Sequence, residues 1–333
     1  MKLTSVLSLL FSFCILSSCA QPGNWKGTVI HNFSGSVNNY SFASKTDKVV
    51  IPESKEPFAA SGDIYFLNDK FNKRGTLIRK FSGGQFKDVL DMSSENSVYK
   101  KQLDEYSFIR GTGISGIMSY MDDPKVSPDG KYISVTILGG HQNAFTKNCV
   151  AVFSMSTQEL ITKFDEKYYG SWTPDNRLVI CGTYKRGSTD EPLYESKSPG
   201  IFITDKNLSN PVRVDPGLND PSPYHATVSP DGGKIAYIIN NRVWIMDITG
   251  KNNKQLSDVD RDNVETYPAF SPDGKYVACW VYKTFERSYY TAIAVLSVAA
   301  PKPVVLSDKA PVWPKDTKGF RISGGNGQMS WIK

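Results

Sequence analysis

The stretch Val228-Ser229-Pro230-Asp231-Gly232, followed by the apolar run at residues 234–239, decides the fold. Proline at the second position of such a turn presets φ, aspartate bonds the local backbone, and glycine accepts left-handed geometry. The stretch therefore predicts a tight turn between two antiparallel strands. Three further copies begin at Ser127, Thr173 and Ser271, so the spacings are 46 (127 to 173), 56 (173 to 229) and 42 (229 to 271) residues. Periods of this size are typical of propellers and solenoids.

Each copy of the turn is followed by the same pattern of runs. In the third copy, β-rich runs at residues 234–239 and 242–248 precede a short third run at 253–256. With the strand before the turn this makes four strands per unit, which is one propeller blade. Helical periodicity is absent from the repeats, so an array of helical hairpins is excluded. Residues 311–320 are a degenerate fifth copy.

Beyond the turn itself, residues 243–257 resemble a repeat of the TolB-type, WD-like propeller family. The resemblance covers about residues 122–320 and implies a β-propeller fold. It implies little about activity, because Ser-Pro-Asp-Gly is a structural turn and one fold serves many functions.

The flanking segments set the number of blades. Residues 40–90 fit one further blade that lacks the signature turn. After residue 310 only three strand positions remain, near Val312, at 320–323 and at 328–332, so the last blade lacks an outer strand. Residues 27–33 would supply it, since closing the ring removes unpaired edges. We predict an all-β, six-bladed propeller of four-stranded antiparallel blades, closed by this N-terminal strand. A seventh blade within residues 91–121 is the alternative.

An export signal precedes this body. Lys2 and an apolar run at residues 3–16 end in Leu16-Ser17-Ser18-Cys19, which resembles a bacterial lipobox. We predict a signal peptide at 1–18, lipidation of Cys19, a tether at 19–26 and a single propeller domain at 27–333. No acidic residue directly follows Cys19, so we expect an outer-membrane lipoprotein that faces the periplasm. The alternative is cleavage after Ala20, which would give a soluble periplasmic or secreted protein.

Composition excludes several function classes. The chain has 333 residues and a net charge of +6 (39 basic minus 33 acidic), with no basic run, so no nucleic-acid partner is expected. No two of the five cysteines have Cys-x-x-Cys spacing, and there are three histidines, so we expect no metal and no cofactor. Cys149, Cys181 and Cys279 lie in apolar runs and are expected to be buried thiols.

The candidate site lies at the mouth of the central channel. The residue four positions before the Ser or Thr of each turn begins the innermost strand of its blade. We expect these residues to form one ring, on the face that carries the long loops: Asp123, Tyr169, His225, Tyr267 and, from the degenerate copy, Ala310. Two tyrosines, a histidine and an aspartate around a concavity favour ligand or partner binding. Alternatively, they only cap the channel and bond the loops between blades.

A second candidate surface is formed by three long loops on that same face. The fourth blade has only Asn240-Asn241 between its second and third strands, a tight hairpin. Its neighbours have long loops at residues 139–148, 185–199 and 283–290. They combine aromatic and basic side chains, as interfaces do, and the candidate partner-binding residues are His141, Phe145, Arg186, Tyr194, Phe285, Arg287 and Tyr289. Alternatively, these are solvated loops whose aromatic side chains rest on the rim.

Motifs for catalysis are absent, and we expect no catalytic residue. Residues 113–117 lack the final glycine of a Gly-x-Ser-x-Gly elbow, and neither a P-loop nor a His-Glu-x-x-His motif occurs. The sequence favours a monomeric, non-catalytic lipoprotein that binds an envelope protein, a peptide or a glycan. The alternative is a small propeller enzyme, a lyase, cyclase or hydrolase-like protein, acting on a glycan or peptide at the channel mouth. Whether the chain is an enzyme stays open at this stage.

Overall fold

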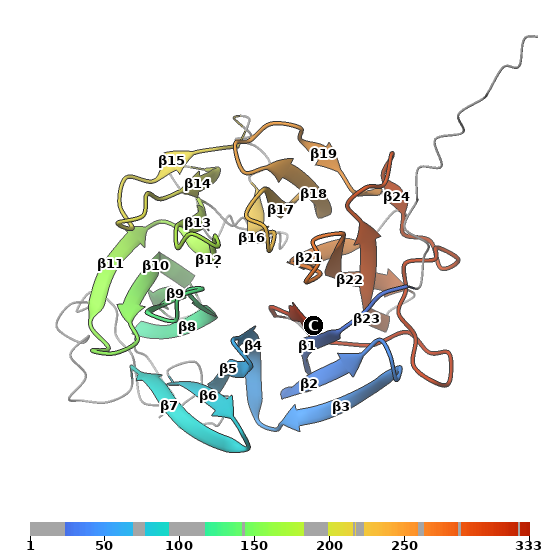
Figure 1. Ribbon diagram of the computed structural model, residues 1–333, viewed down its shortest axis with the longest axis horizontal. Coiled ribbons are helices and arrows are strands. Elements are labelled where there is room, and N and C mark those ends of the chain that lie inside the picture. Colours follow the sequence, from blue (N-terminus) through green and yellow to red (C-terminus); the bar gives the residue numbers. More distant parts are fainter. Residues whose placement is uncertain are drawn as a thin grey trace, which may run out of the picture.

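All regular elements in the described part of the chain are strands. The computed structural model describes residues 24–68, 77–92, 117–141, 144–182, 199–215, 217, 223–258, 263–285, 288–325 and 327–333. Small antiparallel sheets surround a central axis as six blades (Figure 1). The predicted six-bladed β-propeller is confirmed. Within these residues no helix is long and apolar enough to cross a membrane.

Blades 1 to 5 follow the chain, each from its innermost strand outward. Blade 1 comprises β4 (Ser54–Ala60), β5 (Asp63–Asn68), β6 (Leu77–Ser82) and β7 (Gln85–Asp91). Blade 2 comprises β8 (Ile117–Val126), β9 (Tyr132–His141), β10 (Ala144–Ser154) and β11 (Leu160–Asp165). Blade 3 comprises β12 (Tyr168–Trp172), β13 (Leu178–Cys181), β14 (Ile201–Ile203) and β15 (Val212–Arg213). Blade 4 comprises β16 (Tyr224–Val228), β17 (Lys234–Ile239), β18 (Arg242–Asp247) and β19 (Lys254–Gln255). Blade 5 comprises β21 (Val264–Phe270), β22 (Tyr276–Phe285) and β23 (Ser288–Ser297).

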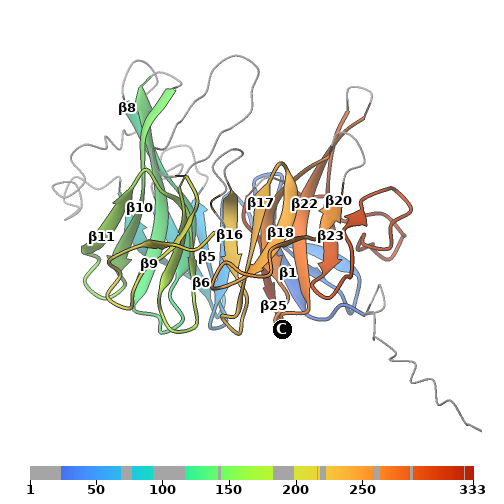
Figure 2. The ribbon, with the colours of Figure 1, turned by 90° about the horizontal axis from the view of Figure 1, so that it is seen from above.

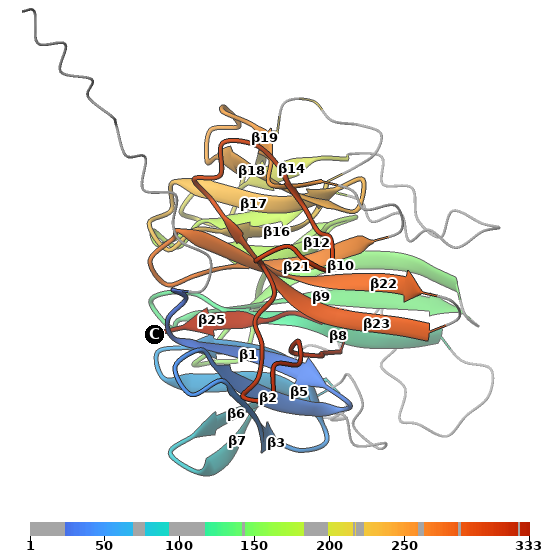
Figure 3. The same ribbon diagram turned by 90° about the vertical axis from the view of Figure 1, so that its right-hand side faces the viewer.

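Blade 6 closes the ring, in a way that corrects the predicted division of strands. Its innermost strand is β25 (Ser330–Ile332), and its other strands are N-terminal: β1 (Thr28–Phe33), β2 (Ser36–Ser41) and β3 (Thr46–Ile51). Thr28 pairs with Ile332 and Ile30 with Ser330, so β1 lies directly beside β25 (Figure 3). An N-terminal strand therefore does close the propeller, but as the second strand of the blade rather than its outer strand.

The segment expected to begin the last blade instead covers the outer edge of blade 5. Val295 donates its N–H to Val312 O at 2.8 Å, and Ile293 donates to Ile322 O at 3.2 Å. Prolines at 311 and 314 lack the N–H that a regular ladder needs, so this edge stays irregular. Beside it, β24 (Val304–Val305) pairs in parallel with β20 (Ser257–Asp258) and joins the edges of blades 4 and 5.

Six apolar clusters lie between neighbouring blades and complete the circle. One joins blades 1 and 2, for example through Leu67 and Ile137, and equivalent clusters follow at each of the other five blade junctions. Because these clusters close every junction, including the one between blades 1 and 2, the ring has no gap for a seventh blade. Cys149, Cys181 and Cys279 are fully buried within these clusters, as expected.

The Ser-Pro-Asp-Gly turns have the predicted structural role. Ser229 Oγ donates to Asp231 Oδ1 at 2.5 Å and accepts the Lys234 N–H at 2.9 Å, while the Gly232 N–H bonds Ser229 O. The hydrogen bond from Ser229 is the main reason that the pKa of Asp231 is below its ordinary value. These turns form one face of the propeller, here called the turn face. The Asn240-Asn241 hairpin lies on the opposite, loop face.

Candidate functional site

The innermost strands of five blades share one irregularity at the same position. Each has a register shift and a residue with left-handed φ: Glu56 (50°), Asp123 (50°), Tyr169 (50°), His225 (50°) and Tyr267 (49°). Left-handed geometry costs a non-glycine residue about 1–2 kcal/mol. Such bulges re-aim a side chain. Four of these side chains line the central cavity described below, and Glu56 Oε2 accepts the Gln328 N–H at 2.8 Å.

The structure thus brings the four predicted residues Asp123, Tyr169, His225 and Tyr267 together, and adds two that the sequence did not reveal. Glu56 occupies the equivalent bulge of β4, and Gln328 lies just before β25. We call these six residues the channel ring. Ala310 is not a member, which corrects the expectation, because β25 rather than residues 311–320 is the inner strand of blade 6. It packs instead on the cluster between blades 4 and 5.

A cavity of about 390 Å³ extends from the channel ring toward the turn face. Pro128, Pro174 and Pro230 line it and are exposed in their turns, which places its mouth there. We expected the concavity on the loop face. The reason for the difference is steric: at the level of the ring, buried side chains such as Tyr169 and His225 fill the channel. The open space therefore lies between the ring and the turns.

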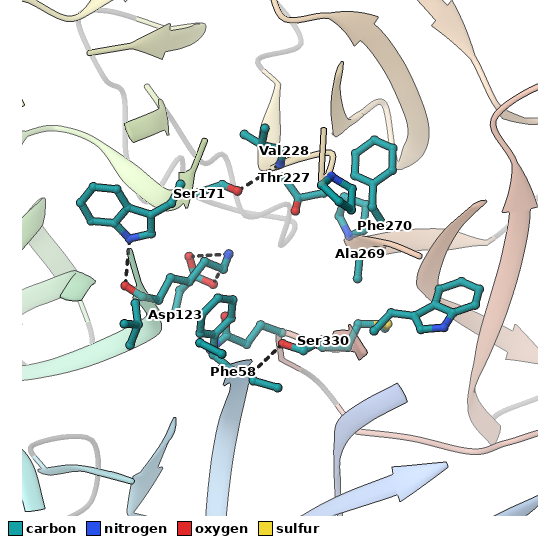
Figure 4. Close-up of a pocket in the computed structure, with 18 of the residues that line it drawn as sticks. Phe58, Asp123, Ser171, Thr227, Val228, Ala269, Phe270 and Ser330 are labelled. Atoms are coloured by element: carbon teal, nitrogen blue, oxygen red, sulfur yellow. Dashed lines mark hydrogen bonds and ion pairs between the residues drawn. The ribbon is translucent and has the colours of Figure 1, made fainter. Parts of the chain in front are cut away.

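The cavity walls combine aromatic and small polar side chains (Figure 4). The aromatic members outside the channel ring are Phe58, Trp172, Phe270 and Trp331. Ser171 Oγ accepts the Val228 N–H at 3.0 Å, and Ser330 Oγ accepts the Ala59 N–H at 3.0 Å. These bonds join neighbouring inner strands and fix the spacing of the walls.

Three aromatic members of the channel ring, Tyr169, His225 and Tyr267, pack against one another at the inner end of the cavity. The centroids of His225 and Tyr267 lie 3.9 Å apart with their planes at 23°, and Tyr169 meets His225 edge-on at 4.1 Å. The Tyr267 N–H donates to His225 Nδ1 at 3.3 Å, so the neutral ring carries its proton on Nε2. Burial, together with the charge of Lys125, lowers the pKa of His225 well below its ordinary value. The imidazole is therefore neutral at physiological pH.

Buried carboxyl groups occupy the adjacent part of the ring. Asp123 is 2% exposed and forms an ion pair with Lys125 at 2.9 Å. Burial raises the pKa of Asp123 to about 6, although Lys125 opposes the change. Burial also raises the pKa of Glu56 and of Asp122. Among the residues that the structure describes, no group of three or more His, Cys, Asp or Glu side chains has the geometry to hold a metal ion.

The predicted loop residues divide into two sets. Arg186, Tyr194 and Arg287, like Cys19, lie outside the described residues. His141, Phe145, Phe285 and Tyr289 belong to strands, not loops, because the hairpins of β9 with β10 and β22 with β23 extend beyond the other blades (Figure 2). Their side chains are outside the described part. The short Asn240-Asn241 hairpin is present as predicted, with φ of 51° and 60°.

Comparison with known proteins extends only to the fold. No family model matches the chain, and no curated protein matches it. Among solved structures, TolB from Acinetobacter baumannii is 17% identical, with a TM-score of 0.44, over 82% of this chain and 67% of that one. An oligogalacturonate lyase in complex with manganese is 12% identical (TM-score 0.44; 78% and 81% covered). A second oligogalacturonate lyase, from Vibrio parahaemolyticus, is 10% identical, with a TM-score of 0.46, over 81% of this chain and 79% of that one.

Proposed function

We propose that this chain is a non-catalytic binding propeller of the bacterial cell envelope, and that it binds a peptide or a glycan in its central cavity. The supporting observation is the cavity itself: about 390 Å³, with aromatic walls and a few polar groups at its inner end. Ligand sites in proteins have this size and this mixture of groups. The strained bulges that aim the ring side chains inward also favour a site, since such strain gathers where ligands bind.

We also propose a TolB-like lipoprotein, attached to the outer membrane through Cys19 and facing the periplasm. The support is the lipobox in the sequence and the position of the first described residues. Trp331 Nε1 donates to Lys26 O at 2.8 Å, and Trp331 and Ile332 line the cavity. The tether therefore joins the propeller beside Trp331, at the junction of blades 5 and 6 and on the side of the turn face. A chain anchored at Cys19 would hold the cavity mouth toward the membrane. The eight residues of the tether, 19–26, span at most about 27 Å when extended, which limits the distance between the propeller and the membrane.

Replacing Cys19 with alanine is expected to release the protein from the membrane into the soluble periplasmic fraction. The reason is that the thiol carries the lipid, and the propeller itself has no other proposed anchor. Fractionation and incorporation of labelled palmitate measure the effect, with Cys149→Ala as the matched control because that buried thiol has no role in anchoring. If the wild-type chain never incorporates palmitate, cleavage after Ala20 is the better account.

Filling the cavity is expected to abolish ligand binding. Thr227→Trp places an indole among the wall residues, while Asn240→Trp adds the same group to the exposed hairpin on the loop face. A random peptide library and a glycan array, screened against the wild-type chain, supply the probes. We expect at least a tenfold loss of affinity for Thr227→Trp. The proposal fails if no probe is enriched, or if Asn240→Trp weakens binding and Thr227→Trp does not.

One observation favours an enzyme as the second candidate. Asp123 has a pKa of about 6 at the inner end of the cavity and lies beside Lys125, which suits a general acid or base. If a peptide or glycan that binds is also converted to products by the wild-type chain, and Asp123→Asn retains binding without conversion, the enzyme replaces the non-catalytic protein. Mass spectrometry of the recovered ligand decides between the two.

A further inference from the structure

Around the inner end of the cavity carboxyl groups outnumber basic side chains, and of these residues Asp123 and Lys125 line the cavity itself. Glu56, Asp122 and Asp123 come from the adjacent inner strands β4 and β8, where the basic side chains are Lys55 and Lys125. The pKa of each carboxyl group is raised by burial, and the two lysines offset this only in part. A further positive charge at this position would therefore stabilise the ionised carboxylates.

Gln328 presents a hydrogen-bond acceptor at the same place. Its Nε2 donates to Glu56 O at 2.9 Å and to Pro124 O at 3.1 Å, which fixes the orientation of the amide. The opposite atom, Oε1, is buried and has no hydrogen-bond partner in the part of the chain that the structure describes. Gln328 is 2% exposed and lines the cavity together with Asp123. A buried acceptor of this kind is satisfied when a ligand supplies an N–H or O–H.

Aromatic faces complete the surroundings. Tyr169, His225 and Tyr267 line the inner end of the cavity. Burial is the main reason that the pKa of Tyr267 is raised well above its ordinary value, and Tyr169, Glu56 and Asp122 raise it further through their charges. The faces of tyrosine rings attract cations through their quadrupole, most strongly where water is excluded. The neutral His225 adds no opposing charge.

We propose that the inner end of the cavity binds a protonated primary amine carried by the ligand. This inference rests on the proposed binding role of the cavity and names the group that the cavity recognises. An ammonium group has three donors, which suit Gln328 Oε1 and the Asp123 carboxylate, and its charge suits the nearby tyrosine rings. A metal ion fits less well, because the described His, Cys, Asp and Glu side chains do not converge in the number that a metal site needs.

The proposed subsite makes binding dependent on pH in a defined direction. A bound ammonium favours ionised carboxylates, so affinity should rise as the pH rises through the pKa of Asp123, about 6. The groups facing Asp123 are Asp122 and Lys125 on its own strand, Glu56 and Lys55 on β4, and the neutral His225 on β16. The ligand itself does not oppose this trend, because an alkylammonium keeps its proton to about pH 10.

The test compares two small probes of equal shape. Isothermal titration calorimetry of the wild-type chain with 2-phenylethylamine and with 2-phenylethanol should show the amine binding at least tenfold more tightly at pH 7.5, with a smaller ratio at pH 5.5. Asp123→Asn and Tyr267→Leu should each reduce the preference for the amine about tenfold. Asn240→Asp, an added charge on the loop face, should leave it unchanged. Circular dichroism melting confirms that each variant folds.

The outcomes separate this inference from the proposed function. Equal affinity for the two probes, or a preference that survives both substitutions, overturns the amine subsite. Displacement of the amine by Mg²⁺, Ca²⁺ or Mn²⁺ at micromolar concentration overturns it in favour of a metal site. If library peptides or glycans bind in the cavity and neither small probe does, the subsite is wrong and the proposed function stands. Peptides with free and with acetylated amino termini then show whether a supporting amine is terminal or from a lysine.

Discussion

Trp280→Ala is expected to lower the free energy of unfolding by about 3–5 kcal/mol, the usual cost of removing a large buried aromatic side chain. Trp280 lies on β22 of blade 5 and is fully buried. Its Nε1 donates to Gly327 O at 2.9 Å, and its ring meets His31 of β1 edge-on at 5.5 Å. It therefore contacts both ends of the chain where they form blade 6. Its loss leaves a cavity at the junction that closes the ring.

Urea denaturation followed by circular dichroism measures this change. Trp280→Phe should cost clearly less, because it keeps most of the apolar contact and loses the bond to Gly327 O. Phe320→Ala should lie within about 0.5 kcal/mol of the wild type, since Phe320 is 68% exposed. Equal destabilisation by Trp280→Ala and Phe320→Ala would contradict the described closure.

The second large effect is expected at Glu265, between blades 4 and 5. Glu265 is fully buried; its Oε2 accepts the Val243 N–H at 2.8 Å and the Ser257 hydroxyl, and Arg242 lies 3.8 Å from Oε1. Glu265→Ala would remove the carboxylate that accepts from Val243 and Ser257, and would leave the buried Arg242 guanidinium without its counter-charge. Breaking a buried ion pair from one side costs about 3–5 kcal/mol, which we expect for the free energy of unfolding.

The pH dependence of stability provides the control for Glu265. Burial raises the pKa of Glu265 to about 7 in the folded chain, above its ordinary value of 4.5. The folded state then binds more protons than the unfolded state between these values, so this group makes stability fall as the pH rises from about 4.5 to 7. Glu265→Gln keeps an acceptor and cannot ionise, so its loss of stability from pH 5 to pH 8 should be smaller. An identical pH profile in the two proteins would contradict the buried titration.

The sequence was informative where a local signal sets the geometry. The Ser-Pro-Asp-Gly turns fix strand order and blade period through bonds between residues two to five positions apart, so Ser229 and Asp231 predicted the fold. The same register placed Asp123, Tyr169, His225 and Tyr267 at equivalent positions. Glu56 and Gln328 were missed because their blades lack the turn. The only sequence signal at these two residues is the short strand pattern beside each of them, at residues 54–60 and 330–332.

Other features depend on contacts that no local pattern encodes. The division of blade 6 between the two termini rests on the pairing of Thr28 with Ile332, and the prolines at 311 and 314 signal only that a regular strand is interrupted. The face on which the cavity opens depends on how far buried ring side chains fill the channel. That is a matter of packing around the axis, where residues from six blades meet.

The most direct test of the central claim is a crystal structure of the wild-type chain with a ligand recovered from the peptide library or the glycan array. We predict ligand density in the cavity, between Phe58, Trp172 and Phe270, with access from the turn face and a polar group within hydrogen-bond distance of Gln328 Oε1. Ligand density on the loop face beside Asn240 and Asn241, with the cavity unchanged, would contradict the account.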